Sequence, residues 1–205
     1  MGSVADLTAT VRRLFVLGDE LVAGFGDPRA LGWLGRVVAR SSPADLLVCT
    51  LAVPGETTTA LSGRWEQEVG RRRAHGTGNE SLVLALGAHD LVAGTSLARS
   101  RLNLANLLDK ADAMHLPVFV VGPPPRSDLD GHAQASLSAA FADVCHRRRV
   151  PYVETYQPLA QHERWLADLA VTDGIHPAQA GHGLIAWLVL HHDWAQWIGT
   201  DVSED

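Results

Sequence analysis

The chain has little cysteine, almost no lysine and no long apolar run. Its two cysteines, Cys49 and Cys145, have no CxxC partner and no zinc-site spacing, so we expect reduced packing residues rather than a disulfide or zinc scaffold. No apolar stretch approaches the ~18–20 residues that cross a bilayer, which excludes a membrane-spanning helix. Lys110 is the single lysine among 17 basic residues, a bias typical of a GC-rich bacterial genome.

The sequence also lacks a leader pattern and a concentrated basic surface. Residues 1–13 have no charged start, apolar stretch and small-residue cleavage site, so we expect a cytoplasmic protein. The net charge is -6, and the basic triplets, Arg71–Arg73 and Arg147–Arg149, fall where helices are predicted to end. Positive charge is favourable at those ends, so we expect neither a nucleic-acid partner nor a membrane-surface partner.

Short apolar runs alternate with longer helical patterns along the whole chain. The runs are almost entirely apolar, as strands buried on both faces of a parallel sheet should be. The predicted strands are Leu14–Leu17, Leu46–Val53, Leu82–Leu86, Val118–Val121 and Tyr152–Val153. The predicted helices are Ala30–Arg40, Thr59–Arg73, Ser96–His115, His132–Arg148 and Ala178–Trp197.

This alternation predicts one α/β domain over residues 1–205, with a core from about residue 13 to 197. The expected architecture is a three-layer α/β/α sandwich around a parallel five-stranded sheet, and 205 residues suffice for such a core. Residues Gly122–Arg126 (GPPPR) directly follow the fourth strand, so we expect a stiff loop at the sheet edge where ligands bind.

Four segments at strand ends or in loops are rich in glycine and polar residues. Neighbouring parallel strands end roughly 5 Å apart, so these segments can converge on one site. The segments are Gly18–Gly24 (GDELVAG), Pro54–Thr58 (PGETT), Gly87–Asp90 (GAHD) and Asp173–Pro177 (DGIHP).

In this order and spacing the four segments resemble the conserved blocks of the SGNH (GDSL) hydrolases, from Leu14 to about Gly183. That family comprises esterases, lipases, thioesterases and carbohydrate deacetylases. The resemblance implies a flavodoxin-like fold acting on a small ester or acyl substrate, with no cofactor and no metal. It also implies that the Gly55 N–H joins the oxyanion hole, that His176 is the base and that Asp173 orients it. Other residues match the family's frame, namely Gly18, Asp19, Leu21, Gly24, Gly87 and Asp90.

Two positions depart from the family pattern. Glu20 stands where the nucleophilic serine should be, and His89 stands where the oxyanion-hole asparagine should be. A carboxylate attacking an ester would form a mixed anhydride well above the ester in energy, which disfavours an acyl-enzyme on Glu20. We expect Glu20 to pair with His176 and weaken it as a base. An imidazole can donate one hydrogen bond, so the change at His89 alone is tolerable.

Three hypotheses follow, and the chemistry favours them in this order. In the first, the protein has little or no hydrolase activity, and Glu20 is structural or binds a ligand. In the second, Glu20 or His176 activates water, while His89 and the Gly55 N–H stabilise the oxyanion. In the third, Glu20, His89 and His176 form a two-histidine, one-carboxylate metal site.

The sequence therefore predicts an esterase-like hydrolase with weak or altered catalysis, or alternatively a non-catalytic small-molecule binding protein that uses the same pocket. The candidate catalytic residues are Glu20, Asp173 and His176, and the candidate oxyanion-hole or substrate-binding residues are Gly55, His89 and Asp19. We expect Asp19 chiefly to fasten its loop by hydrogen bonds. We expect Asp27-Pro28, followed by Trp33, to shape the loop wall, with a place for Trp33 beside a pocket as the alternative. A displaced nucleophile is disfavoured because no alternative hydroxyl lies on a tight strand-to-helix turn. The alternative hydroxyls are those of Thr57, Ser62, Ser81 and Ser96.

Overall fold

A computed structural model describes residues 11–41, 45–73 and 79–199. Residues 1–10, which carry most of the segment searched for a leader, lie outside this range. Five strands form one sheet in the order β2-β1-β3-β4-β5, and every neighbouring pair is parallel. The strands are β1 Arg12–Gly18, β2 Leu46–Ala52, β3 Glu80–Ala85, β4 Val118–Val121 and β5 Tyr152–Val153. The predicted parallel five-stranded sheet is confirmed.

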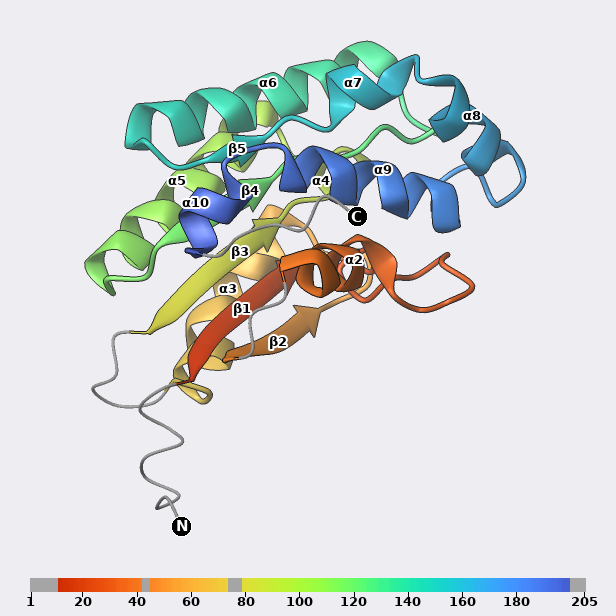
Figure 1. Cartoon of the computed structure of the whole chain (residues 1–205). Helices are drawn as coiled ribbons and strands as arrows, with labels where there is room; N and C mark the ends of the chain where they lie inside the picture. The colour runs from red at the N-terminus through yellow and green to blue at the C-terminus, as the bar shows by residue number, and fades with distance from the viewer. Residues whose placement is uncertain (1–10, 42–44, 74–78, 200–205) are drawn as a thin grey trace.

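Helices cover both faces of this sheet (Figure 1). One face carries α2 Gly32–Ser41, α7 Tyr156–Ala160, α8 Glu163–Ala170, α9 Gln179–Leu190 and α10 Trp194–Ile198. The other face carries α3 Thr58–Gly70, α5 Leu97–Ala113 and α6 Gly131–Arg148. The short helix α4, His89–Val92, directly follows β3 at the carboxyl edge of the sheet. This is the three-layer α/β/α sandwich that the sequence predicts.

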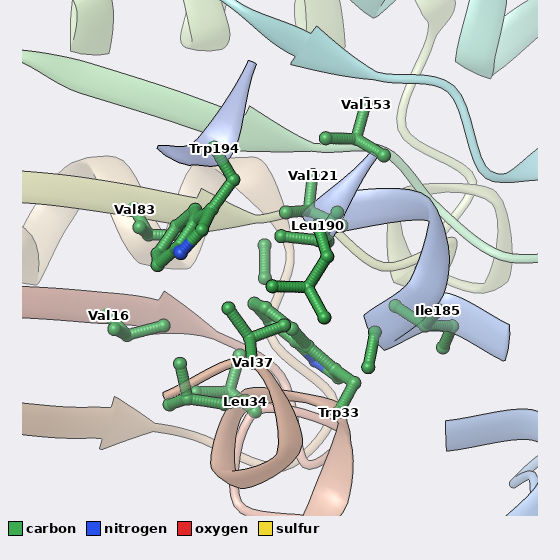
Figure 2. Close-up of a cluster of buried hydrophobic side chains, with 14 of the residues drawn as sticks. Val16, Trp33, Leu34, Val37, Val83, Val121, Val153, Ile185, Leu190 and Trp194 are labelled. Atoms are coloured by element: carbon green, nitrogen blue, oxygen red, sulfur yellow. The ribbon is translucent and has the colours of Figure 1, made fainter. Parts of the chain in front are cut away.

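Alternate residues of each central strand enter two separate apolar clusters. In β1, Val16 faces the cluster of α2, α9 and α10, whereas Phe15 faces the cluster of α3, α5 and α6. Figure 2 shows the first cluster, in which strand valines meet Trp33 of α2 and Trp194 of α10. Because both faces are covered, the strands are apolar at nearly every position. Trp33 is 1% exposed and packs in this cluster, and it also lines a small cavity beside Asp19 and Leu21.

The predicted elements differ from the observed ones mainly near the C-terminus. The predicted helix Ala178–Trp197 is two helices, because Asp193 has φ 48° in the left-handed region and breaks the hydrogen-bond ladder between α9 and α10. Helices α7 and α8 were not predicted. Trp165 of α8 is fully buried, and its indole N–H donates to the Pro125 carbonyl at 3.2 Å. No helix in the described part of the chain is long and apolar enough to cross a membrane.

The carboxyl ends of three strands finish level with one another. In the sheet register Gly18, the last residue of β1, pairs with Ala52 of β2 and with Ala85 of β3. The loops that follow these strands therefore start from the same edge of the sheet. This alignment positions the residues of the candidate site.

Candidate functional site

Loops at the carboxyl edge of the sheet bring together Glu20 and His89, the two residues that differ from the family pattern, and their partners. Glu20 lies in the turn after β1, Gly55 follows β2, and His89 begins α4 after β3. Asp173 and His176 lie in the loop that leads to α9. Because β1 lies between β2 and β3, the Glu20 carboxylate contacts both Gly55 and His89.

The Glu20 carboxylate is the centre of the site. Its Oε1 lies 3.0 Å from His89 Nε2 and 3.0 Å from His176 Nε2. Its Oε2 accepts a hydrogen bond of 2.7 Å from the Gly55 N–H. Partial burial acts to raise the pKa of Glu20, but the hydrogen bonds outweigh it and hold the pKa well below its usual range. Glu20 is therefore an ionised, hydrogen-bonded carboxylate.

His176 and Asp173 form a close pair. The imidazole Nδ1 lies 2.5 Å from Asp173 Oδ2. Asp173 Oδ1 accepts from the backbone N–H groups of Ile175 at 2.9 Å and His176 at 2.8 Å. The His176 backbone hydrogen bond is the main reason that the pKa of Asp173 falls to about 2. Phe25, 56% exposed, packs edge-on against the His176 ring at a centroid distance of 4.7 Å.

His89 faces acidic groups on one side and a cation on the other. Its Nε2 contacts Glu20 Oε1 and lies 3.5 Å from Asp19 Oδ2. Its Nδ1 lies 3.4 Å from Nη1 of Arg126. The hydrogen bond with Glu20 raises the pKa of His89, and Asp19 adds to this, while burial and Arg126 act in the opposite direction.

Asp19 is a buried carboxyl group beside Glu20. Its Oδ1 accepts from the Leu21 N–H at 3.0 Å, which closes the turn after β1. Burial, followed by the neighbouring charge of Glu20, raises the pKa of Asp19 to about 6. A Cβ on Gly87 would lie 1.9 Å from Asp19 Oδ2, so this position requires glycine. Asp19 lies near the centre of the site and also fastens its loop.

The described residues reproduce the predicted metal trio in part. Within the described ranges, one group of histidine and acidic ligand atoms lies within 4.8 Å, and it joins Asp19, Glu20 and His89. This group lacks His176 from the predicted metal trio. The two-histidine, one-carboxylate metal site therefore stays a prediction.

The other hydroxyls examined have structural roles or lie elsewhere. Thr57 and Ser96 cap the N-termini of α3 and α5, respectively. Ser62 donates back to a carbonyl of its own helix at 2.8 Å, and Ser81 lies at the amino end of β3, away from the carboxyl edge. The described contacts of these hydroxyls do not bring one to Glu20.

Sequence reasoning missed two contributors to the site. It placed Gly122–Arg126 at the ligand edge but did not assign Arg126 to His89, because a loop pattern does not give a side chain's direction. It identified Asp90 only as a frame residue. Asp90, 1% exposed, accepts from the N–H of Thr58 at 2.8 Å and from its hydroxyl at 2.7 Å. This contact fastens α4 to the start of α3.

Solved structures share this fold. The chain is similar to a lipase/acylhydrolase from Enterococcus faecalis, at 20% identity and a TM-score of 0.76, over 95% of this chain and 100% of that one. An acetylxylan esterase, Axe2, from Geobacillus stearothermophilus matches at 18% identity and a TM-score of 0.72, over 95% and 97%. The psychrotrophic esterase EstA from Pseudoalteromonas sp. matches at 17% identity and a TM-score of 0.71, over 92% and 100%.

A comparison with curated protein sequences gives no match. A family model does match, over residues 16–184, which include all four of the segments that meet at Glu20. The chain belongs to the GDSL-like lipase/acylhydrolase family.

Proposed function

We propose that this chain is a small-molecule binding protein built on a GDSL hydrolase frame, and that Glu20 blocks the family's esterase reaction. One observation supports the loss of the esterase reaction: the Gly55 N–H, the expected oxyanion-hole donor, is already bonded to Glu20 Oε2 at 2.7 Å. An ester carbonyl oxygen would need that same donor as negative charge develops on it. The chain's own carboxylate therefore competes with the transition state for its stabilising group.

The chemistry of Glu20 supports the same conclusion. The carboxylate is held ionised by its hydrogen bonds, so it is a weak base. As a nucleophile it would give an anhydride in place of an ester intermediate. His176 is not free to act as the general base in place of a Ser–His pair, because its Nε2 already contacts Glu20 while its Nδ1 contacts Asp173.

A second candidate function is hydrolysis by an activated water without an acyl-enzyme. The retained Asp173–His176 pair, at 2.5 Å, is the observation that favours it. In this case Glu20 or His176 would accept a proton from water, and the substrate oxygen would have to displace Glu20 from the Gly55 N–H.

Our first prediction separates these two candidates by restoring a serine. Glu20→Ser should open the Gly55 donor and supply a hydroxyl beside His176. We expect wild type to be inert toward p-nitrophenyl acetate and Glu20→Ser to turn it over at a rate well above background. Glu20→Ala is the matched control, because it opens the same space without a nucleophile.

Glu20→Ser/His176→Ala should lose the gained activity, because the serine then has no base. If wild type turns over the ester and both Glu20→Ser and Glu20→Ala are slower, then Glu20 takes part in catalysis. That result would reject the binding proposal in favour of the activated-water mechanism.

A further inference from the structure

The two imidazoles that flank Glu20 Oε1 have opposite outer partners. His176 Nδ1 faces the acceptor Asp173 Oδ2 at 2.5 Å. His89 Nδ1 faces a donor, Nη1 of Arg126, at 3.4 Å. Both ring nitrogens of His176 therefore face carboxylates, whereas His89 has a carboxylate on one nitrogen and a guanidinium on the other.

We propose that Arg126 is a positioning residue that opposes protonation of His89 and sets the tautomer of its neutral ring, with the proton on Nε2. A guanidinium can only donate, so the nitrogen that it approaches must offer a lone pair. With Nδ1 used as an acceptor, the one ring proton lies on Nε2 and points at Glu20 Oε1. His89 then has the same hydrogen-bonding role as an amide donor.

The loop that carries Arg126 is built to hold it in place. The backbone N–H of Arg126 donates to Gln134 Oε1 at 2.8 Å, and the Arg126 carbonyl accepts from Gln134 Nε2 at 3.0 Å. Gln134 lies on α6 and is 4% exposed. The guanidinium is also paired with Asp128 through Nε at 2.9 Å and Nη2 at 2.7 Å, which leaves Nη1 directed at His89.

The neutral form of His89 needs such a device because of its other neighbours. Glu20 and Asp19 both lie beside Nε2 and favour a positively charged ring. Arg126 is the cation that opposes them from the Nδ1 side. Glu20 Oε1 also contacts His176 Nε2, and Asp173 contacts His176 Nδ1, so the two carboxylates face opposite nitrogens of that ring.

The protonation state can be read directly by nitrogen-15 NMR of histidine-labelled full-length protein. His89 is assigned by the loss of its signals in His89→Asn. At a pH above the His89 titration, we expect Nδ1 to have the shift of an unprotonated nitrogen and Nε2 that of a protonated one. The pH titration of the same signals is then compared between wild type and Arg126→Met.

Loss of Arg126 should move the His89 titration upward by about one pH unit, because an opposing charge within hydrogen-bond distance is removed. Arg126→Lys should restore part of the difference, since it keeps a charged donor. Arg147→Met is the matched control: it removes an aspartate-paired arginine from the exposed side of α6 and should leave His89 unchanged.

A wild-type His89 with its proton on Nδ1 would overturn the proposal, and this result does not depend on any variant folding. So would an Arg126→Met titration no different from that of Arg147→Met. Enzyme kinetics give a second, independent measurement, and only this measurement rests on the proposed function. In the Glu20→Ser background, Arg126→Met should lower kcat with little change in KM and shift the pH profile.

Discussion

The Glu20 carboxylate has three close polar partners, more than the single oxygen of a serine hydroxyl could contact in the same way. Two imidazole nitrogens lie 3.0 Å from Oε1, and the Gly55 N–H donates to Oε2 at 2.7 Å. The longer side chain reaches from the nucleophile position into the oxyanion hole, as its length alone suggests. A single substitution therefore changes both the nucleophile and the group that would stabilise the transition state.

Asp19 should weaken the fold at neutral pH. Its folded-state pKa of about 6 lies above the ordinary aspartate value of 3.8, so its contribution to stability is full below about pH 4 and is lost as the pH rises through about 6. A shift of about two pH units corresponds to about 3 kcal/mol. We predict that Asp19→Asn raises the free energy of unfolding above pH 6 by about 1–3 kcal/mol and has little effect near pH 4.

Urea unfolding of wild type and Asp19→Asn across this pH range measures the effect. The asparagine amide oxygen can still accept from the Leu21 N–H, so the turn after β1 is kept. Equal differences in stability at both ends of the range would show that the Asp19 charge is not the cause.

At the residue scale the sequence predicts which groups meet, but not how their protons are shared. The glycine and aspartate frame locates Glu20 and His89 unambiguously, because strand ends must share an edge. Arg126 escaped prediction, since its direction depends on Gln134 and Asp128, which lie in a helix and a loop of ordinary composition. Hydrogen-bond geometry of this kind is set by tertiary packing.

Among the elements, α9 fastens the loop that carries Phe25. His182 of α9 is fully buried, and its Nδ1 accepts from the Trp33 N–H at 3.1 Å while its Nε2 donates to the Phe25 carbonyl at 2.9 Å. The same side chain therefore joins α9 to the start of α2 and to the loop after β1. Phe25 in turn packs on His176.

His182→Ala should destabilise the protein by about 2–4 kcal/mol at pH 8, because it removes two buried hydrogen bonds and leaves a cavity. Burial lowers the folded-state pKa of His182, so its contribution to stability is present above the ordinary histidine value and is lost as the pH falls. The cost of the substitution should thus be smaller at pH 5. Chemical denaturation at both pH values tests this, with the exposed His146→Ala as a control.

Sequence patterns predict these elements to different degrees. The buried strands stand out because neither face tolerates polar residues, and β4 Val118–Val121 and β5 Tyr152–Val153 are predicted to the residue. Helix α8 is only 8 residues long and buries two residues, Trp165 and Leu169, so its apolar pattern is too short to be recognised as a helix from the sequence. The break before α10 depends on a left-handed residue, Asp193, that no glycine marks.

At the scale of the whole molecule, one sheet joins two apolar clusters. Neighbouring residues of β1 point into opposite clusters, as do neighbouring residues of β3, so neither helical layer has a core without the sheet. Loss of either layer exposes strand residues that the other layer cannot cover. The domain is therefore expected to unfold as one unit.

Fluorine NMR of protein labelled with 5-fluorotryptophan tests this expectation. Trp33 lies in one cluster and Trp65 in the other, and each is almost fully buried. We predict that their native signals disappear with the same urea midpoint, after assignment with Trp33→Phe and Trp65→Phe. Separate midpoints would mean that one helical layer detaches before the other.

The place of Glu20 has a final consequence for free acids in solution. Ester hydrolysis releases a carboxylic acid, and Glu20 puts a carboxylate where such a product would remain, against the Gly55 N–H and His176. The protein thus resembles an esterase held in complex with its own product by a covalent tether. A tethered group acts at a local concentration of about millimolar or more and cannot diffuse away. Under the proposed function, free acetate or a fatty acid would have to displace the tethered Glu20 carboxylate from these contacts, and dilution would not remove Glu20.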